Sequence, residues 1–298
     1  MFDTTPSLDC AGRQLKLDRP RIMGIVNVTP DSFSDGGQHA DTEAAVMHGL
    51  LLVEQGADML DIGGESTRPG AQEVSADEEI ARVVPVIERL SRKTGIPIGI
   101  DTSKPEVMRA AVAAGAGLIN DVYALRREGA LDAACELGVP IVLMHMQGEP
   151  RSMQDAPHYD DVVGEVKRFL ADRIFACELA GIPKSRLIVD PGYGFGKNLE
   201  HNLDLLARQE ELAALGVPLL AGLSRKRMLG EITGREVGKR IPASVAAHLV
   251  AAQNGAAILR VHDVEPLRDA LALWNAVKAR LRPSATKSSA RAGWPDED

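Results

Sequence analysis

Cysteine is scarce in this chain of 298 residues, and its placement excludes two common uses of the residue. The three cysteines, Cys10, Cys135 and Cys177, are odd in number and far apart, and no CxxC spacing occurs. A disulfide framework is built from an even set of cysteines, and a structural zinc site from closely spaced pairs. We therefore expect neither of them in this protein.

The chain also lacks long apolar runs and an excess of positive charge. No apolar stretch approaches the roughly 18 residues of a membrane span, and no basic region followed by an apolar core marks a secretory signal at the N-terminus. The formal net charge of −8 gives no general attraction to nucleic acid or to anionic membranes. We expect a soluble cytoplasmic protein in which local cations bind any anionic ligand.

Hydrophobic residues make up 45% of the sequence and gather in eight short apolar runs. Such runs are typical of parallel strands covered on both faces, and the segments between them have helical patterns. Eight strand–helix units in series favour a single (β/α)8 TIM barrel, with an open doubly wound sheet as the alternative. The runs are IMGIVNV (22–28), MLDIG (59–63), PIGIDT (97–102), LINDV (118–122), PIVLMH (140–145), LIVDP (187–191), PLLAGLS (218–224) and AILRVH (257–262).

The barrel pattern leaves the two ends of the chain unassigned. Residues 1–20 precede the first apolar run, and we expect a short extension there, with a hairpin around Gly12. Residues 283–298 are polar and rich in Ser and Ala, a composition typical of disorder. The expected organisation is an extension over 1–20, one barrel domain over 21–282 and a disordered tail over 283–298.

Each apolar run ends near a polar or charged residue. The carboxyl ends of all strands in a (β/α)8 barrel face one mouth, where such enzymes keep their chemistry. One acid there is explained equally well as a helix cap, but a whole ring of polar groups is costly to desolvate without a ligand. The sequence therefore predicts a ligand site at this mouth, lined by Asn27, Asp61, Asp101, Asn120, His145, Asp190, Ser224, Lys226, Arg260 and His262.

The stretch GYGFGK, from Gly192 to Lys197, has the composition of a phosphate-binding loop but not its spacing. A P-loop needs GxxxxGK followed by Ser or Thr, whereas Pro191 stands here for the first glycine and Asn198 follows the lysine. The Rossmann pattern GxGxxG is not matched either. We expect the glycines to let the backbone pass close to a flat ligand, and Phe195 to pack on that ligand or in the core.

Two further loops, NVTPDSFSDGG (27–37) and GGESTRPGA (63–71), are rich in Gly, Ser and Pro. Both follow strands and overhang the predicted mouth. Loops of this composition act as lids over a substrate, and plain surface turns are the alternative. Phe33 and Arg68 are suited to ligand contact rather than to turn geometry, so we expect lids.

From about Ile22 to Asp263 the chain resembles the dihydropteroate synthase family of the folate pathway. The resemblance rests on eight motifs in the family's order: NVTPDSFSDGG, GGESTRPG, IDTSKP, INDV, MHMQG, DPGYGFGK, GLSRK and RVHDV. One motif alone is weak support, but eight in sequence are specific. The departures are mild, because they are confined to Tyr193, where the family often has Phe, and to Arg227 and Met228, where Ser-Phe is common.

The resemblance implies a transferase that condenses 6-hydroxymethyl-7,8-dihydropterin diphosphate with 4-aminobenzoate, giving 7,8-dihydropteroate and diphosphate. It implies that Asp190 binds the pyrimidine edge of the pterin, which presents two adjacent N–H donors. A buried carboxylate accepts both of them in a pair of charge-assisted hydrogen bonds. Asn120 is expected at the neighbouring edge, Asp101 at ring nitrogens on the opposite side, and Lys226 at the pterin oxygen or a ring nitrogen. Met144 is an apolar wall or a core residue.

The difficult step of this reaction is the departure of diphosphate, because a neutral arylamine already offers its lone pair. Catalysis then consists of stabilising the leaving group's charge and holding the pterin. Arg260 and His262 alternate along the last strand and so project to one side. With Asn27 and Thr67 they are expected to bind the diphosphate, and Mg²⁺ to bridge its oxygens and the Asn27 side chain. The expected catalytic residues are Asn27, Lys226, Arg260 and His262, with Asn27 as the metal ligand.

The aminobenzoate is expected further out, under the two loops. The resemblance places Phe33 and Pro69 beside its ring, and Ser224, with Arg68 or the helix start after it, at its carboxylate. Sulfonamides resemble aminobenzoate and are expected to compete there. The resemblance also implies a homodimer that uses the later barrel helices.

Two other functions fit part of this pattern. A methyltetrahydrofolate-dependent methyltransferase domain would share Asp101, Asn120 and Asp190 but would not need residues that bind diphosphate. A non-catalytic pterin-binding relative would keep the barrel and alter the two loops or the SRK motif, and both are present here.

Overall fold

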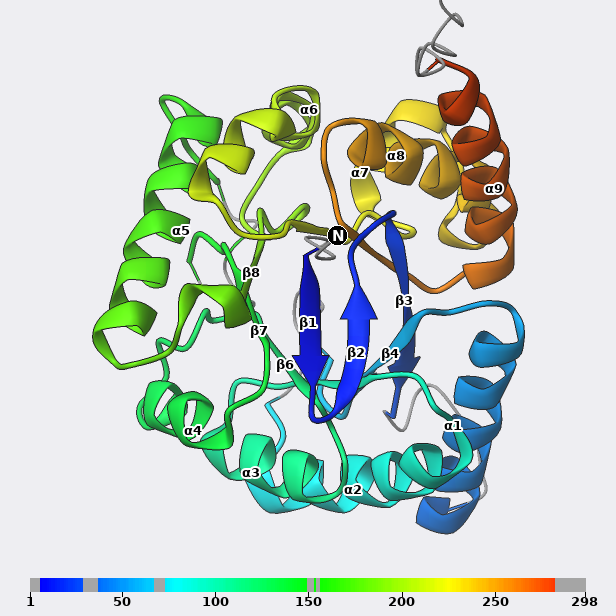
Figure 1. Ribbon diagram of the computed structural model, residues 1–298. Helices are drawn as coiled ribbons and strands as arrows, with labels where there is room; N and C mark the ends of the chain where they lie inside the picture. The colour runs from blue at the N-terminus through cyan, green and yellow to red at the C-terminus, as the bar shows by residue number, and fades with distance from the viewer. Residues whose placement is uncertain (1–5, 29–36, 67–72, 149–152, 154–155, 282–298) are drawn as a thin grey trace, which may run out of the picture.

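The computed structural model describes residues 6–28, 37–66, 73–148, 153 and 156–281, and its centre is a ring of eight parallel strands (Figure 1). They pair in the order β8-β7-β6-β5-β4-β3-β10-β9, and a bridge between Val189 and Leu219 joins the ends of this series. The TIM barrel is confirmed and the open doubly wound sheet is excluded. The strands are β3 (Arg21–Asn27), β4 (Met59–Gly63), β5 (Ile98–Asp101), β6 (Leu118–Asp121), β7 (Ile141–Met144), β8 (Leu187–Asp190), β9 (Leu220–Ala221) and β10 (Ile258–Val261).

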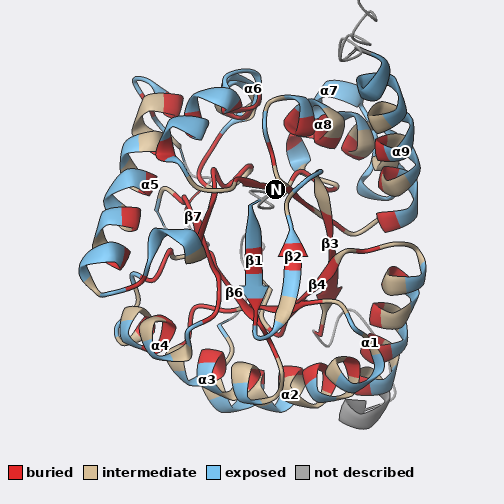
Figure 2. Ribbon diagram, viewed as in Figure 1, coloured by how far each residue is buried: buried red, intermediate tan, exposed pale blue. Residues whose placement is uncertain are grey.

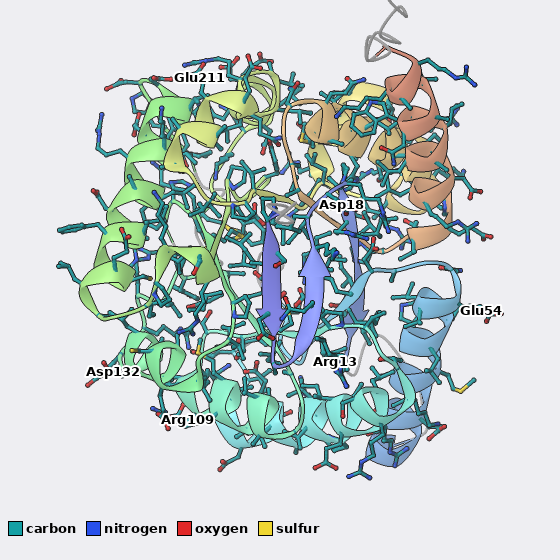
Figure 3. The ribbon with its side chains drawn as sticks, viewed as in Figure 1. Arg13, Asp18, Glu54, Arg109, Asp132 and Glu211 are labelled. Atoms are coloured by element: carbon teal, nitrogen blue, oxygen red, sulfur yellow. The ribbon has the colours of Figure 1, made fainter. Side chains whose placement is uncertain are left out.

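Helices follow these strands in the predicted alternation and surround the ring. The strands are buried, whereas the helices have buried and exposed residues along their length (Figure 2). The charged side chains of Arg109, Asp132 and Glu211 extend outward from the helical layer (Figure 3). The helices are α1 (Gly37–Glu54), α2 (Ala76–Lys93), α3 (Pro105–Ala113), α4 (Ala130–Leu137), α5 (Val162–Leu179), α6 (Leu199–Ala207), α7 (Arg227–Thr233), α8 (Ile241–Gln253) and α9 (Val264–Leu281), with short 3-10 turns at Lys184–Arg186, Gln209–Leu215 and Val237–Lys239.

A hairpin covers the amino end of the barrel. It consists of β1 (Ser7–Cys10) and β2 (Arg13–Lys16), it turns at Gly12 as predicted, and it lies across the ring in Figure 1. Three of its side chains, Leu8, Cys10 and Leu15, are buried in a cluster with residues near the strand starts: Met23, Met59, Leu118, Val142, Ile188, Leu220 and Ile258. Because apolar side chains fill this end, polar ligand contacts are left to the carboxyl ends of the strands.

The structure leaves part of the expected organisation untested. Residues 1–5 and the predicted tail over 283–298 lie outside the described residues, so the division into extension, barrel and tail remains a prediction. In the part of the chain that the structure describes, no helix combines the length and the apolar character needed to cross a membrane.

Candidate active site

The register of the parallel strands places four strand ends at one level. Asn27 on β3 pairs with Gly63 on β4, Gly63 with Asp101 on β5, and Asp101 with Asn120 on β6. On the other side of the barrel, the last residue of β8, Asp190, pairs with Met144 on β7. The predicted polar groups therefore come from successive strands at the same end of the ring.

Asp61 lies deeper than predicted. It is two residues before the end of β4 and is fully buried, so the expectation that it lines the mouth is wrong. Its Oδ2 accepts hydrogen bonds from Asn120 Nδ2 at 2.9 Å and from Arg260 Nε at 2.6 Å, whereas Oδ1 has no hydrogen-bond partner among the described residues. Asp61 therefore fixes the orientation of Asn120 and Arg260 from below.

Arg260 crosses the floor of the mouth and pairs with two acids. Its Nη2 donates to Asp101 Oδ2 at 2.6 Å, in addition to the bond from its Nε to Asp61. Burial alone would lower the pKa of Arg260, but the carboxylates of Asp61 and Asp101 raise it above its ordinary value. The guanidinium is thus permanently charged and held in one place, as a preorganised cation must be.

Asp101 carries a carboxyl group whose pKa is strongly raised. Burial raises its pKa to about 7, the Arg260 charge opposes this rise, and the nearby carboxylates of Asp61, Glu79 and Asp121 add to it. The carboxyl group therefore exchanges a proton near neutral pH, which fits a group that faces ring nitrogens able to donate or accept.

Asp190 and Lys226 face the same space from β8 and the segment after β9. Asp190 is buried, and its Oδ1 accepts the backbone N–H of Gly192 at 2.7 Å. Burial raises the pKa of Asp190, while this hydrogen bond and the cations Lys226 and Arg260 oppose the rise. Burial lowers the pKa of Lys226 to about 8 against the attraction of Asp190. The two charges therefore affect each other's pKa, and the contacts of both residues with a pterin stay a prediction.

Met144 belongs to a buried apolar cluster, and its role as a ligand wall stays a prediction. Met144 is buried in a cluster with Val122, Met146 and Met153, against which Phe195 packs. The Lys226 ammonium lies 4.2 Å from the centre of the Phe195 ring, a cation–π distance. A flat ligand bound here would contact apolar side chains on its face and charged groups along its edge.

The glycine-rich loop is built around an internal lysine and not around a phosphate. Lys197 is buried, and its Nζ donates to the carbonyl oxygens of Gly192 at 2.9 Å and Phe195 at 3.0 Å. It also lies 2.9 Å from His145 Nδ1. Gly192 has φ +67°, and a β-carbon there would lie 1.9 Å from the His145 carbonyl oxygen. Only glycine fits such a contact.

His145 is consequently a structural residue, and the prediction that it lines the mouth is wrong. It is buried, and its ring contacts the edge of Phe169 with centroids 4.9 Å apart. Burial and the charges of Lys197 and Arg126 lower its pKa to about 2, so the ring is neutral and accepts the lysine proton.

Replacing Lys197 should destabilise the glycine-rich loop that it holds together. Lys197→Met leaves two carbonyls and one imidazole nitrogen without their buried donor, and we expect a loss of about 2–4 kcal/mol in the free energy of unfolding. Urea denaturation of the variant, with Lys93→Met on the exposed end of α2 as the matched control, measures the effect. A loss below about 0.5 kcal/mol would contradict the structural role.

The departure of this chain from the family at Tyr193 has a partner in the structure. The Tyr193 hydroxyl donates to Gln209 Oε1 at 2.8 Å, and Gln209 Nε2 donates to the carbonyl oxygens of Ala251 and Asn254. A buried phenol needs such an acceptor. The tyrosine thus joins the loop to α8 without entering the mouth.

A second buried lysine lies behind Asp101 and was not singled out from the sequence. Lys104, in the IDTSKP motif, donates from Nζ to Glu65 and, at 2.6 Å, to Glu79 Oε2. Glu79 is fully buried, and in the part of the chain that the structure describes its other oxygen has no hydrogen-bond partner. This cluster places negative charge near Asp101 and so contributes to the raised pKa of that acid.

Asn27 and His262 complete the described part of the site. Asn27 is half-buried at the end of β3; its Oδ1 and the Asp101 Oδ2 both lie 3.9 Å from the position of a β-carbon on Gly63. His262 forms its ring hydrogen bond with Ser224 Oγ, at 3.0 Å from Nδ1, so Ser224 contacts this imidazole. The remaining predicted contacts, Phe33, Thr67, Arg68 and Pro69, lie outside the described residues.

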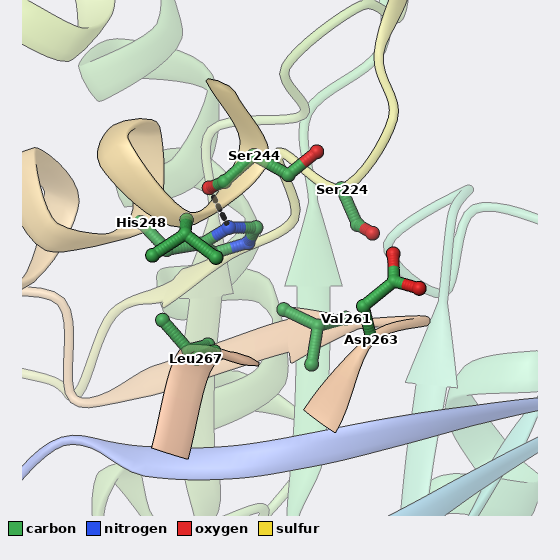
Figure 4. Close-up of a pocket in the computed structure, with 7 residues that line it drawn as sticks. Ser224, Ser244, His248, Val261, Asp263 and Leu267 are labelled. Carbon is green, nitrogen blue, oxygen red and sulfur yellow. Dashed lines mark hydrogen bonds between the residues drawn. The ribbon is translucent and has the colours of Figure 1, made fainter. Parts of the chain in front are cut away.

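A small pocket next to this site is not the substrate site. It lies beside α8 and is lined by Ser224, Ser244, Val245, His248, Val261, Asp263 and Leu267 (Figure 4). Its empty space of about 170 Å³, partly open to solvent, is below the roughly 300 Å³ of a ligand pocket. Its importance lies in His248, another residue that the sequence did not reveal.

His248 ties the segment after β9 to α8. It is fully buried, its Nδ1 lies 2.7 Å from the Ser244 carbonyl oxygen (Figure 4), and the Leu223 N–H donates to its Nε2 at 3.2 Å. Nδ1 therefore carries the ring proton and Nε2 is the acceptor. Burial lowers the pKa of His248 from 6.5 to about 4, so the folded state excludes the charged form.

This histidine predicts a stability that depends on pH. Because its folded-state pKa is depressed, its contribution is fully present above pH 6.5 and is lost as the pH falls towards 4. The free energy of unfolding of the wild type should therefore fall by about 2 kcal/mol more than that of His248→Gln between pH 6.5 and 5. Urea denaturation of both proteins across this range measures the difference, and parallel pH curves would show that the histidine is not the titrating group.

Comparisons with known proteins agree with this geometry. The family model of pterin binding enzymes matches residues 23–262. Dihydropteroate synthase of Escherichia coli strain K12 is 51% identical over 260 residues, which are 87% of this chain and 92% of that protein.

Two solved structures of Xanthomonas albilineans dihydropteroate synthase have the same fold. The structure with 4-aminobenzoic acid has a TM-score of 0.89 and 66% identity, over 93% of this chain and 99% of that chain. The structure with 7,8-dihydropteroate has a TM-score of 0.85 and 64% identity, over 92% and 99%. This chain belongs to the family of pterin-binding enzymes, among the dihydropteroate synthases.

Proposed function

We propose that this protein condenses 6-hydroxymethyl-7,8-dihydropterin diphosphate with 4-aminobenzoate to give 7,8-dihydropteroate and diphosphate. The observation that supports the proposal is that Asp101 and Asn120 are paired at neighbouring strand ends, while Lys226, in the segment after β9, is close enough to Asp190 and Asp101 for their charges to affect its pKa. The relatives with bound 4-aminobenzoic acid and 7,8-dihydropteroate support the same pair of substrate and product.

Pterin recognition is proposed to use donors and acceptors that have no other partner among the described residues. One N–H of Asn120 is donated to Asp61, which leaves its side-chain oxygen and its second N–H for the ligand. Asp190 accepts one backbone N–H and retains lone pairs for the two adjacent donors of the pyrimidine edge. Lys226 then donates to the pterin oxygen or a ring nitrogen, with Phe195 and Met144 as the apolar walls.

The chemical step needs a stabilised leaving group more than a base. The arylamine is neutral at pH 7, so its lone pair is available as soon as the diphosphate departs. Arg260 and His262 supply a fixed cation and an imidazole beside the developing charge, and Thr67 is proposed to add a hydroxyl donor. These groups lower the barrier by electrostatic stabilisation and by holding the methylene carbon in line with the amine.

Magnesium fits this site as a partner of the diphosphate. The described residues contain no group of three or more His, Cys, Asp or Glu side chains that could hold a metal by themselves. Mg²⁺ commonly takes one or two protein oxygens and completes its shell with phosphate and water, so the half-buried amide of Asn27 suffices as the protein ligand. When bound, the ion neutralises charge on the diphosphate.

The aminobenzoate is proposed to lie above the pterin, with its ring between Phe33 and Pro69 and its carboxylate near Arg68. Ser224 is proposed to share that carboxylate, and its Oγ also lies 3.0 Å from His262 Nδ1. Sulfonamides are proposed to compete for the same position. Aminobenzoate binding should require bound diphosphate, and equal affinity for the enzyme without pterin and diphosphate would contradict that order.

The proposal includes a cytoplasmic homodimer. Exposed apolar side chains occur on the later helices and the segment between α7 and α8, as the predicted interface requires: Ile232, Val237, Val250, Leu273 and Val277. Light scattering of the purified protein tests this assembly, and a monomer at micromolar concentration would contradict it.

An assay of diphosphate release separates this function from its two alternatives. The protein is mixed with the pterin diphosphate and Mg²⁺, with and without 4-aminobenzoate. Release that depends on aminobenzoate supports the synthase. Pterin binding without release would identify a binding protein, and methyl transfer from methyltetrahydrofolate would identify a methyltransferase.

A further inference from the structure

The turn that follows β6 contains two consecutive residues in the left-handed conformation. Ala124 has φ +52° and Leu125 has φ +57°, and both residues are buried. Residues other than glycine rarely adopt this conformation, because the β-carbon crowds the backbone, and such strain persists only where surrounding groups hold it. The turn comes directly after Asn120 and Asp121, so the strained backbone lies next to a proposed pterin contact.

Hydrogen bonds from two side chains hold this turn. Asp121 is fully buried at the end of β6; its Oδ1 accepts the Tyr123 N–H at 2.8 Å, and its Oδ2 accepts the Leu125 N–H at 2.7 Å. From α5, Arg173 donates Nε to the Ala124 carbonyl oxygen at 2.8 Å and Nη2 to the Leu125 carbonyl oxygen at 3.3 Å. The strand end therefore binds the N–H groups of the turn, and the helical layer binds its carbonyl groups.

Asp121 also joins this turn to the segment after β5. Its Oδ1 accepts a hydrogen bond from the hydroxyl of Ser103, a buried residue two positions after Asp101. The backbone of the same segment is bound to β6, since the Thr102 N–H donates to the Asn120 carbonyl oxygen at 3.0 Å. Burial raises the pKa of Asp121, whereas its hydrogen bonds with Ser103 and with the turn oppose that rise. One carboxylate thus connects the chain beyond two neighbouring strand ends.

In the chain, Asp121 lies between two residues with contacts in the mouth. Asn120 donates one N–H to Asp61, and its remaining donor and acceptor are proposed for the pterin. Val122 is buried in the apolar cluster that contains Met144 and is proposed to face the ring. The Asp121 carboxylate therefore fixes the backbone from which both of these side chains project.

We propose that Asp121 is a positioning residue that holds the strained turn after β6 and the segment after β5, and so keeps Asn120 and Val122 in place before the pterin binds. This inference rests on the proposed function, in which Asn120 contacts the pterin. A site that is already ordered loses little free energy to the ordering of its own chain when the ligand binds. Loss of Asp121 should therefore weaken pterin binding and leave the departure of diphosphate from bound substrate nearly unchanged.

Hydrogen exchange followed by mass spectrometry tests whether Asp121 holds the turn. Asp121→Asn replaces one accepting oxygen with an N–H₂ donor, so at least one of the two N–H groups loses its acceptor. Peptides that cover residues 122–126 should exchange at least about tenfold faster than in the wild type, and saturating pterin alcohol should slow them again. The same substitution at an exposed acid, Asp132→Asn on α4, is the matched control. Unchanged exchange in Asp121→Asn would overturn the proposal.

Calorimetry with the pterin alcohol measures the consequence for binding. Asp121→Asn should bind it about tenfold more weakly than the wild type, and Ser103→Ala, which removes one of the three hydrogen bonds, about threefold more weakly. Arg173→Met should also lose about threefold, with Arg168→Met on the exposed face of α5 as its matched control. In all of these variants, kcat at saturating substrate and affinity for inorganic diphosphate should stay within about twofold. Equal losses in pterin and diphosphate binding would indicate a damaged fold and overturn the positioning role.

A thermodynamic cycle identifies the contacts through which the carboxylate acts. Asn120→Ala combined with Val122→Ala removes both side chains that are proposed to contact the pterin. On that background, Asp121→Asn should weaken pterin binding by less than about twofold further, because the residue acts through those two. A further tenfold loss would mean that Asp121 acts on the pterin by another route, and the proposal would be wrong.

These outcomes separate the role of Asp121 from the function of the enzyme. If the wild type binds the pterin alcohol but releases no diphosphate in the presence of aminobenzoate, the proposed function fails, while the affinities of the variants still decide the positioning role. If the wild type binds no pterin, both fail. Thermal melts of each variant establish that the fold is retained, and Ser103→Ala, the mildest change, decides the question if Asp121→Asn does not fold.

Discussion

Asp190→Asn should weaken pterin binding by about a hundredfold or more. The wild-type carboxylate is buried at the end of β8, where we propose that it accepts from the donor edge of the pterin. The amide replaces one accepting oxygen with a donor, which then faces an N–H of the ligand. Losing a charge-assisted pair and leaving donors unpaired costs about 3 kcal/mol or more.

Calorimetry with the pterin alcohol measures this loss without the diphosphate contacts. The same substitution at an exposed acid, Asp132→Asn on α4, is the matched control and should bind as the wild type does (Figure 3). The Gly192 N–H can still donate to the remaining oxygen of the amide, so the loop should keep its structure. Affinity within threefold of the wild type would show that the pterin does not lie against Asp190.

The barrel was predictable because its strands are buried on both faces. Parallel strands of this kind read as short apolar runs, and MLDIG, LIND and LIVD became β4, β6 and β8 with almost the predicted bounds. Their carboxyl ends converge by the geometry of the fold, so the identity of the residue at each end gave most of the mouth. These are local properties of the sequence combined with one rule of topology.

The depth of each side chain in the mouth, and the side chains that it contacts there, were not predictable in the same way. Asp61 and Gly63 project to the same side of β4, and the sequence does not say that the acid lies one layer below the ligand. His145 was placed at the mouth because it follows β7, but Lys197, 52 residues later, binds its ring. Such contacts depend on which distant side chain fills a space, and no local pattern records this.

The contacts of Ser224 also could not be predicted from the sequence. The resemblance placed it at the carboxylate of aminobenzoate, since it lies in the GLSRK motif near the mouth. The structure brings it against His262 through the pairing of β9 with β10. The two residues lie 38 positions apart, so no local pattern in the sequence predicts this contact.

Arg260→Ala should have the largest combined effect on stability and turnover. The substitution removes the cation from between Asp61, which is fully buried, and Asp101. Breaking a buried ion pair from one side costs about 3–5 kcal/mol, because the acids keep their desolvation cost and lose their partner. Turnover should fall by about a hundredfold or more, since the leaving group loses a fixed cation, while affinity for the pterin alcohol changes far less.

The pH dependence of this variant identifies the acid responsible. The folded-state pKa of Asp101 is already raised to about 7, so its stabilising contribution is lost as the pH rises through that value. Without Arg260 the pKa of Asp101 rises further. Asp101 in the variant therefore stays protonated at pH values at which Asp101 in the wild type is ionised. Its deficit in unfolding free energy should therefore grow by up to about 1.4 kcal/mol per pH unit above pH 7.

Urea denaturation at pH 5.5 and pH 8 tests this, with Arg260→Ala combined with Asp101→Asn as the matched variant. Removing the ionisable group should abolish the extra loss at pH 8 while leaving the turnover defect in place. An Arg260→Ala deficit that is equal at both pH values would mean that Asp101 does not hold the proton. Equal losses in turnover and in affinity for the pterin alcohol would move Arg260 from the leaving group to the pterin ring.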